Sequence, residues 1–172
     1  MRNLFTKGLL ITLSLTVSIW AATYTTSTEY FTDTQGQRTK FRIGIPNNYT
    51  PGTEAKVLIH FHGNNSGSQD RMLDMWHPQT QREADERGLI PVTMASPEYY
   101  MRDGDTIRQW NEDKDPQLLL EFLQSDLGGF VKPDPNGVYL WGDSKGGCFL
   151  NAYLLKYPDN YGGGTIDERS IR

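Results

Sequence analysis

Three short and nearly continuous apolar runs divide the sequence, and each is typical of a buried β-strand. They lie at residues 56–61, 89–94 and 138–141. Strands of a parallel sheet that is covered on both faces show such runs, because neither face meets water. We therefore expect these three segments to form the middle of a mostly parallel sheet.

Two earlier segments show a weaker strand pattern. Residues 30–32 and 39–45 are rich in residues that favour strands, and the second segment alternates in places. It is stopped by Pro46-Asn47-Asn48, a strong turn signal. These features predict two early antiparallel strands.

Helical patterns fill much of the interval between the first two apolar runs. Residues 69–76 and 79–87 have helical character on either side of Pro78, and Gly88 is placed to cap the second segment. Proline removes a helical hydrogen bond and clashes with the preceding turn. We therefore expect a break at Pro78, with one helix before it and one after it.

Two further helices are predicted in the second half of the chain. Asp115 and Pro116 offer an N-cap and a first-turn proline for a helix that carries Leu118, Leu119 and later apolar positions. Residues 145–157 are apolar nearly all round, as in a helix buried against a sheet. Strands that alternate with helices in this way predict an α/β fold with right-handed crossovers.

The composition agrees with one globular domain. Of the 172 residues, 37% are hydrophobic and 22% are charged, with no repeat and no low-complexity run. The single cysteine, Cys148, cannot form an intramolecular disulfide. Its apolar neighbours favour a small core residue over a nucleophile. We expect no cofactor.

The first 22 residues have the pattern of a signal peptide. Arg2 and Lys7 precede the apolar run 8–20, and small residues up to Ala22 follow it. Cleavage there would leave residues 23–172 as a secreted or periplasmic protein; an uncleaved anchor or the first turn of a core helix is the alternative. Loss of the two cations takes the formal charge from −4 to −6, which disfavours nucleic acid or an anionic membrane as a partner.

One motif carries a clear chemical meaning. Gly142-x-Ser144-x-Gly146 lies between the third apolar run and the last predicted helix. A strained turn between a strand and a helix needs small neighbours, and it lifts the serine hydroxyl clear of the sheet. The pattern therefore predicts Ser144 as a nucleophile, with the main-chain N–H of Lys145 as one oxyanion donor.

A second feature upstream agrees with this interpretation. The first apolar run ends in His62-Gly63-Asn64. In α/β-hydrolases the second oxyanion donor comes from the loop after the third strand. We assign that donor to the main-chain N–H of Asn64, with Gly63 allowing close approach of the main chain. An ordinary Gly-Asn turn is the alternative.

These residues resemble a family, the secreted esterases of the polyhydroxybutyrate depolymerase and feruloyl esterase type in the α/β-hydrolase superfamily. The matching segments are Leu58-Ile-His-Phe-His-Gly63, Ala84-Asp-Glu-Arg-Gly88, Pro133-Asp-Pro-Asn-Gly-Val-Tyr-Leu-Trp-Gly-Asp-Ser-Lys-Gly-Gly147 and Tyr157-Pro158-Asp159. The resemblance covers about residues 30–163. It implies a serine esterase that cleaves acyl or aryl esters of polysaccharides, or polyesters. Lys145 departs from the family, which often has a small or neutral residue there.

The rest of the expected triad is missing from the sequence. Only 28 residues follow Ser144 and none is a histidine, whereas this fold places an acid and then a histidine after the serine. We interpret His60 as a hydrogen-bonded core residue, and His62 and His77 as equally unsuited to act as the base. We therefore expect an incomplete α/β-hydrolase fold, the amino-terminal portion of a catalytic domain, which is nearly inert alone.

Two alternatives to an esterase stay open. One is a secreted protein that kept the turn but lost the chemistry, and that binds carbohydrate. The other is a serine peptidase or acyltransferase on the same fold.

Residues 96–115 show no sustained period, and we expect a long functional loop there. Its aromatic residues Tyr99, Tyr100 and Trp110 suggest a substrate cleft, with core packing or a lid as equal alternatives. Its acidic residues suggest calcium binding, although their spacing matches no known loop and a solvated surface is the simpler interpretation. They are Asp103, Asp105, Glu112, Asp113 and Asp115.

Overall fold

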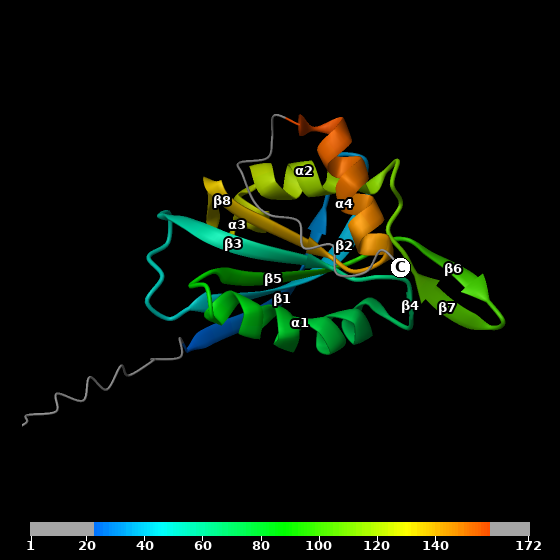
Figure 1. Cartoon of the computed structure of the whole chain (residues 1–172), viewed down its shortest axis with the longest axis horizontal. Coiled ribbons are helices and arrows are strands. Elements are labelled where there is room, and N and C mark those ends of the chain that lie inside the picture. The colour runs from blue at the N-terminus through cyan, green and yellow to red at the C-terminus, as the bar shows by residue number, and fades with distance from the viewer. Residues whose placement is uncertain (1–22, 159–172) are drawn as a thin grey trace, which may run out of the picture.

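The computed structural model describes residues 23–158. The predicted signal peptide and the last residues of the chain lie outside this range. Within it, the strands form a larger sheet with the order β1-β2-β5-β3-β8 and a smaller one with the order β4-β7-β6 (Figure 1). The larger sheet contains β1 (Tyr24–Thr32), β2 (Arg38–Pro46), β3 (Glu54–Phe61), β5 (Ile90–Ala95) and β8 (Lys132–Gly142), and the smaller contains β4 (Asn65–Ser66), β6 (Tyr99–Arg102) and β7 (Asp105–Arg108).

The strand directions confirm the predicted α/β architecture. β3 pairs in parallel with β5 on one side and with β8 on the other. β1 and β2 form the predicted antiparallel pair, and β2 joins β5 in antiparallel register. The three buried runs of the sequence therefore lie side by side, and their carboxyl ends meet at one edge of the sheet.

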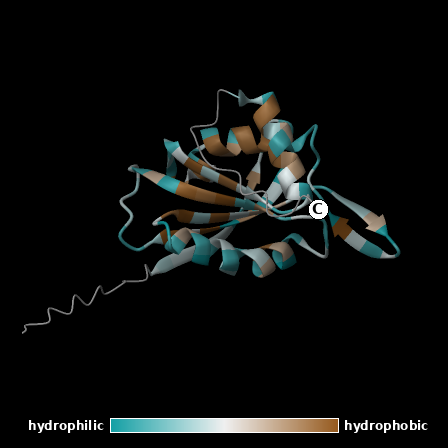
Figure 2. Ribbon diagram, in the orientation of Figure 1, coloured by the Kyte–Doolittle hydropathy of each residue, from teal (hydrophilic) through white to brown (hydrophobic). Residues whose placement is uncertain are grey.

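Helices cover both faces of this sheet. They are α1 (Gln69–Asp85), α2 (Asp115–Gln124), α3 (Asp126–Gly129) and α4 (Lys145–Lys156). α1 lies on one face, and α2, α3 and α4 lie on the other (Figure 1). Hydrophobic residues are concentrated in the central strands between these layers and in α2 and α4, which lie on one face of the sheet (Figure 2). No helix among residues 23–158 combines the length and the apolar character needed to cross a bilayer.

The main core lies between the sheet and the helices α2 and α4. Its buried side chains come from alternate positions of the strands and from one face of each helix. They include Phe41, Ile43, Ile59, Phe61, Val92, Met94, Leu140, Phe122, Phe149 and Tyr153. On the other face, Ala84 of α1 packs with Leu58 and Leu89. Phe61, at the end of β3, is thus fixed by the core next to the edge where the strands end.

The predicted break at Pro78 is wrong, because α1 runs through the proline as one helix. Ser68 caps its start, accepting a hydrogen bond from the Arg71 N–H. A proline inside a helix costs about 3 kcal/mol. Full burial of an apolar side chain yields roughly 1.5–3 kcal/mol, and Met72 and Leu73 are both fully buried. Packing on the sheet therefore outweighs the lost hydrogen bond.

The expected long loop at 96–115 is also wrong in part, because it contains the hairpin β6–β7, which pairs with β4. The two residues between the hairpin strands are Asp103 and Gly104, with φ values of +52° and +86°. Two-residue turns with positive φ at both positions match the twist of a hairpin, and Asp-Gly is a preferred sequence for them. The sequence therefore contained a signal for this hairpin, the dipeptide Asp103-Gly104.

Two other segments have irregular local features. Residues 133–137 (Pro-Asp-Pro-Asn-Gly), which favour a turn, lie inside β8, where the register shifts between Ala55 and Val57 of β3, so these residues bulge out of the strand. Asp115 is not the N-cap of α2, since Lys114 holds that position. Pro116 does lie in the first turn, as predicted.

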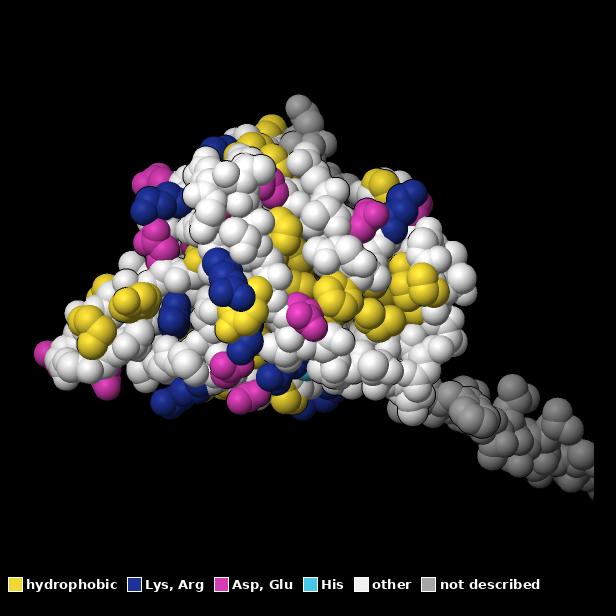
Figure 3. Space-filling view, turned by 180° about the vertical axis from the view of Figure 1, so that it is seen from behind, with side chains coloured by type: hydrophobic (Ala, Val, Ile, Leu, Met, Phe, Trp, Pro, Cys, Tyr) yellow, Lys and Arg dark blue, Asp and Glu magenta, His cyan; other side chains and the backbone are white. Residues whose placement is uncertain are grey.

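The helix α4 forms where expected but is not buried all round. Gly146, Phe149, Leu150 and Tyr153 are buried, whereas Leu155 is 86% exposed. Cys148 is exposed, so its expected place in the core is wrong. β8 is an edge strand in the part of the chain that the structure describes. The described part of the rear face shows acidic and basic side chains interspersed (Figure 3).

Asp115 is a buried carboxyl group whose titration should be visible in the stability. Its oxygens accept hydrogen bonds from the Asn111 N–H at 2.7 Å and from Gln37 Nε2 at 2.6 Å. Burial nevertheless raises the pKa of Asp115 to about 7. The folded state therefore holds this proton more tightly than the unfolded chain, and stability falls as the pH rises from about 4 to 7.

We expect Asp115→Asn to remove this component. Between pH 5 and pH 8 the wild type should lose roughly 2–3 kcal/mol more stability than the variant. Urea unfolding of both proteins at the two pH values measures this difference, and Asp113→Asn, at an exposed neighbouring position, is the matched control. Equal pH dependence of wild type and Asp115→Asn would contradict the assignment.

Candidate active site

Ser144 lies on a strained turn between β8 and α4. β8 ends at Gly142, α4 begins at Lys145, and Ser144 has φ +49° and ψ −115°. Positive φ in a residue other than glycine costs of order 1–3 kcal/mol and persists only where the surroundings enforce it. Ser144 is exposed. The predicted geometry, a serine on a tight strand-to-helix turn, is therefore present.

The glycines on either side of Ser144 are required by close main-chain packing. A Cβ atom at Gly142 would lie 2.5 Å from the Gly146 carbonyl carbon. A Cβ atom at Gly146 would overlap the carbonyl oxygen of Phe61. The Asp143 N–H also donates to the Phe61 carbonyl at 3.0 Å. The turn is thus pressed against the end of β3, with no side-chain atoms between them.

The loop after β3 lies directly against the serine. A Cβ atom at Gly63 would be 3.0 Å from both the Ser144 Cβ and the Asp143 carbonyl oxygen. Gly63 is buried, and Asn64, the next residue, is exposed. The two motifs that the sequence singled out, 80 residues apart, are therefore in contact.

His62 fixes the orientation of this loop. Its Nδ1 donates to the Gly63 carbonyl at 2.6 Å, and its Nε2 accepts from the Ser96 N–H at 3.0 Å. A carbonyl can only accept and an amide N–H can only donate, so the neutral tautomer with Nδ1 protonated is determined. In a trans peptide the C=O and the following N–H point in opposite directions. Holding the Gly63 carbonyl toward His62 therefore directs the Asn64 N–H away from that ring.

His60 anchors the turn from the other side. It is fully buried on β3, and its Nε2 donates to Asp143 Oδ2 at 2.8 Å. Its ring lies against Trp141 and Trp76, with centroid distances of 4.5 and 5.1 Å. Burial lowers the pKa of His60, more than the Asp143 carboxylate raises it. His60 is thus the hydrogen-bonded core residue that was predicted; its partner in the nucleophile turn was not.

The side chain of Lys145 turns away to a partner on the segment before α2. Its Nζ lies 2.7 Å from Glu112 Oε1, and both side chains are 43% exposed. The hydrogen bond to Glu112 raises the pKa of Lys145. Lys145 is the first residue of α4, and N–H groups in the first turn of a helix have no partner within the helix. Its amide is therefore suited to bind an oxyanion beside Ser144.

The three aromatic residues proposed to line a cleft lie in different environments in the structure. Trp110 is 2% exposed and packs on Phe61 and Phe149, so the core alternative is correct for it. Tyr99 is 59% exposed on the hairpin and lies under the Arg108 guanidinium at 5.0 Å. Tyr100 lines a cavity of about 260 Å³ together with Asn64.

The acidic residues of the same segment do not converge. Glu112 pairs with Lys145, Asp115 is buried against Asn111 and Gln37, and Asp103 and Asp105 lie at the hairpin turn. Among residues 23–158 no group of three or more His, Cys, Asp and Glu side chains is arranged to hold a metal ion.

Known proteins resemble this chain in structure but not in sequence. No protein-family model matches the sequence, and no curated protein matches it. Solved structures do match. A feruloyl esterase module from Clostridium thermocellum shares 14% identity over 86% of this chain and 56% of its own, with a TM-score of 0.55. The chain has part of the α/β-hydrolase fold.

Other structures agree on the fold and differ in activity. A thermostable esterase shares 16% identity over 81% of this chain and 40% of its own, with a TM-score of 0.57. Oligopeptidase B from Trypanosoma brucei shares 14% identity over 84% of this chain and 20% of its own, with a TM-score of 0.55. The chain thus spans about half or less of the length of the structures that it matches.

The packing of Gly146 against β3 makes a sharp prediction. Gly146→Ala should destabilise the protein by roughly 3 kcal/mol or more, because the new methyl group overlaps the Phe61 carbonyl and main chain must shift. Gly147→Ala is the control. Its Cβ would meet the Gly142 oxygen at 3.3 Å, and alanine gains up to about 1 kcal/mol of helix propensity. Urea unfolding of the two variants compares them; equal losses of stability would refute this packing.

The buried histidines predict an acid-labile fold. Burial lowers the pKa of His62 and of His77 to about 4 each. In the unfolded chain these imidazoles take up a proton near pH 6.5. Their contribution to the stability is therefore fully present above that pH and is lost as the pH falls toward 4. Each histidine contributes up to roughly 3 kcal/mol, and together they exceed the opposite effect of Asp115. NMR titration of the imidazole Cε1–H signals measures the pKa values; midpoints near 6.5 would contradict the assignment.

Proposed function

We propose that this chain carries the nucleophile and oxyanion site of a serine hydrolase that cleaves carboxylic esters. Ser144 is the nucleophile, and the main-chain N–H groups of Lys145 and Asn64 stabilise the oxyanion. The observation that carries the proposal is the strained Ser144, with φ +49°, held against Gly63 of the loop after β3. Strain of this kind is retained at functional sites.

The proposed chemistry is an acyl transfer in two steps. The Ser144 hydroxyl oxygen attacks the ester carbonyl carbon, and the carbonyl oxygen becomes an oxyanion in reach of the two N–H donors. The carbon–oxygen bond to the alcohol then breaks, and the alcohol leaves with a proton. Water attacks the acyl-serine in turn, which releases the carboxylic acid and restores Ser144.

The general base of this mechanism is proposed to come from outside these 172 residues. His60 is bound to Asp143, and His62 is bound to Gly63 and Ser96. His77 lies within α1, 3.1 Å from Thr93 Oγ1. No histidine follows Ser144 in the sequence, whereas the acid and the histidine follow the serine in this fold.

Substrate and location are proposed from the sequence pattern. The leader pattern supports a secreted or periplasmic protein. The resemblance to polyhydroxybutyrate depolymerases and feruloyl esterases supports esters of polysaccharides, or polyesters, as substrates. The feruloyl esterase module that shares the fold adds support for an ester as the substrate.

The test uses a fluorophosphonate probe and an external base. Without its base a serine hydrolase loses about a million-fold in turnover, so labelling of the 172-residue protein should be slow. Because the proposal lacks only a base, added imidazole should accelerate labelling by roughly ten-fold or more. Peptide mass spectrometry should locate the label on Ser144, and Ser144→Ala should abolish it. Labelling at another residue, or a Ser144 that stays unlabelled with imidazole, would refute the proposal.

A further inference from the structure

One hydrogen bond joins the buried centre of the sheet to the turn that carries Ser144. His60 Nε2 donates to Asp143 Oδ2 at 2.8 Å, and Asp143 directly precedes the nucleophile. The imidazole is fully buried, whereas the Asp143 side chain is 22% exposed. The carboxylate is thus partly open to water and is held by a donor that is fixed in the core.

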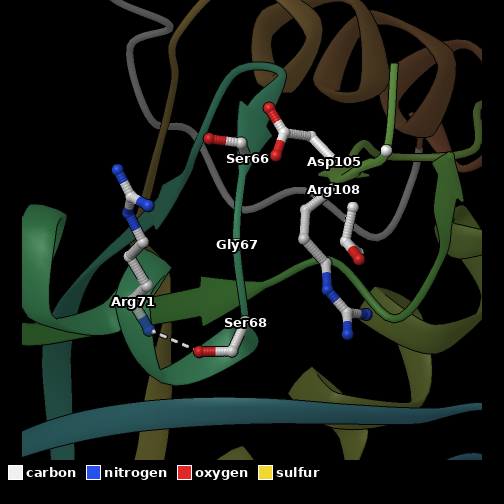
Figure 4. Close-up of a pocket in the computed structure, with 8 residues that line it drawn as sticks. Ser66, Gly67, Ser68, Arg71, Asp105 and Arg108 are labelled. Carbon is white, nitrogen blue, oxygen red and sulfur yellow. Dashed lines mark hydrogen bonds between the residues drawn. The ribbon is translucent and has the colours of Figure 1, made fainter. Parts of the chain in front are cut away.

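Aromatic rings from two neighbouring elements fix the imidazole. Its ring centroid lies 4.5 Å from that of Trp141 on β8 and 5.1 Å from that of Trp76 on α1. α1 begins soon after the loop that follows β3, and its N-cap Ser68 accepts a hydrogen bond from the Arg71 N–H (Figure 4). The capped start of α1 and the end of β8 therefore determine together where the ring of His60 lies.

The hydrogen bond keeps the Asp143 carboxylate on the face of the sheet that α1 covers. Successive residues of a strand point to opposite faces. His60 pairs in register with Trp141, so the alternation past Gly142 places Asp143 on the same face as His60. Lys145 begins α4 on the other face (Figure 1). The carboxylate is therefore directed away from the helix whose first N–H is the proposed oxyanion donor.

A histidine at this buried position carries a cost that an apolar residue would avoid. The Asp143 carboxylate can only accept, so Nε2 is the protonated nitrogen and Nδ1 is an acceptor. Among residues 23–158 this buried Nδ1 has no partner. An unpaired buried acceptor lowers stability, and a leucine would remove it. The contribution that only the imidazole can make here is its charge-assisted hydrogen bond to Asp143.

The orientation of the Asp143 carboxylate matters because an oxyanion forms beside it in the proposed reaction. The α-carbons of consecutive residues are about 3.8 Å apart, so a carboxylate that turned toward Ser144 would approach the developing negative charge. Like charges at close range in a partly buried site oppose each other strongly. The turn itself also needs support, because Ser144 is strained at φ +49°.

We propose that His60 is a positioning residue of the nucleophile. Through Asp143 it holds the strained turn of Ser144 at the end of β3, and it keeps a negative charge turned away from the oxyanion. It is fully buried and touches neither the substrate nor the reacting atoms. The inference rests on the proposed function, and it adds to that function the residue that controls the geometry of the nucleophile.

Substitutions at residue 60 test this role in the full 172-residue chain. His60→Leu keeps an apolar side chain in the core and removes the donor. His60→Gln places an amide nitrogen as many bonds from Cβ as Nε2 of the imidazole, whereas in His60→Asn the amide nitrogen is one bond closer. Glutamine should therefore restore the hydrogen bond, and asparagine should not.

The first measurement is the rate at which a fluorophosphonate labels Ser144 in the presence of imidazole, under conditions where urea unfolding shows each variant to be folded. His60→Leu and His60→Asn should lower this rate about ten-fold or more, and His60→Gln should recover most of it. His77→Leu is the control, because His77 is also buried but contacts Thr93 and not the turn. It should leave the rate unchanged.

A second set of variants tests whether His60 acts through Asp143. Asp143→Ala removes the acceptor at a partly exposed position, and it should lower the labelling rate as much as His60→Leu. It also replaces His60→Leu as the test if that variant does not fold. Asp143→Asn keeps an acceptor for the imidazole N–H and should label faster than Asp143→Ala. Combining His60→Leu with Asp143→Ala should cause no further loss, whereas additive losses would overturn the inference.

An NMR measurement separates failure of the inference from failure of the proposed function. The amide signals of Lys145 and Gly146 should shift in His60→Leu and return toward their wild-type positions in His60→Gln, whether or not Ser144 reacts. Equal labelling of wild type and His60→Leu, or a rate that glutamine does not restore, would overturn the inference and keep the proposed function. An unlabelled wild type whose amide signals respond as expected would remove the proposed function and keep His60 as the residue that positions the turn.

Discussion

Contact of main chain with main chain is the constraint on which this structure depends. Gly146 at the start of α4 lies against the Phe61 carbonyl at the end of β3, and Gly63 lies against Ser144. A side chain at residue 146 would overlap the Phe61 carbonyl, and a Cβ at residue 63 would be in tight contact with the Ser144 Cβ at 3.0 Å. The core behind Phe61 fixes the strand end, and the strand end then forces the turn into a conformation that serine does not adopt by itself. The stability of the sheet is thus what holds the hydroxyl and the adjacent amides in place.

The sequence was sufficient for those parts of the fold that local chemistry determines. Continuous apolar runs predicted the parallel strands, and Gly142 and Gly146 predicted the turn, because both signals follow from steric rules within a few residues. The break at Pro78 was wrong, since the energy that keeps α1 intact comes from the sheet beneath it. Cys148 was wrong for a related reason: an apolar neighbourhood in sequence does not say which face of α4 is covered.

In the candidate site, too, the sequence predicts the features that neighbouring residues determine, and not those that depend on tertiary packing. Ser144 and Gly63 could be singled out from their flanking residues, but their contact depends on β3 and β8 being neighbours in register. The hydrogen bond between His60 and Asp143 is of this kind as well, since it joins residues 83 apart.

All three histidines of the sequence are buried, with at most 4% of any of them exposed. Reagents that acylate imidazole need access to a ring nitrogen, and this protein presents none in its folded state. Chemical modification can therefore show which polypeptide segment carries a reactive imidazole. If a preparation that cleaves esters is inactivated by such a reagent while it stays folded, the sensitive imidazole belongs to a polypeptide segment other than these 172 residues.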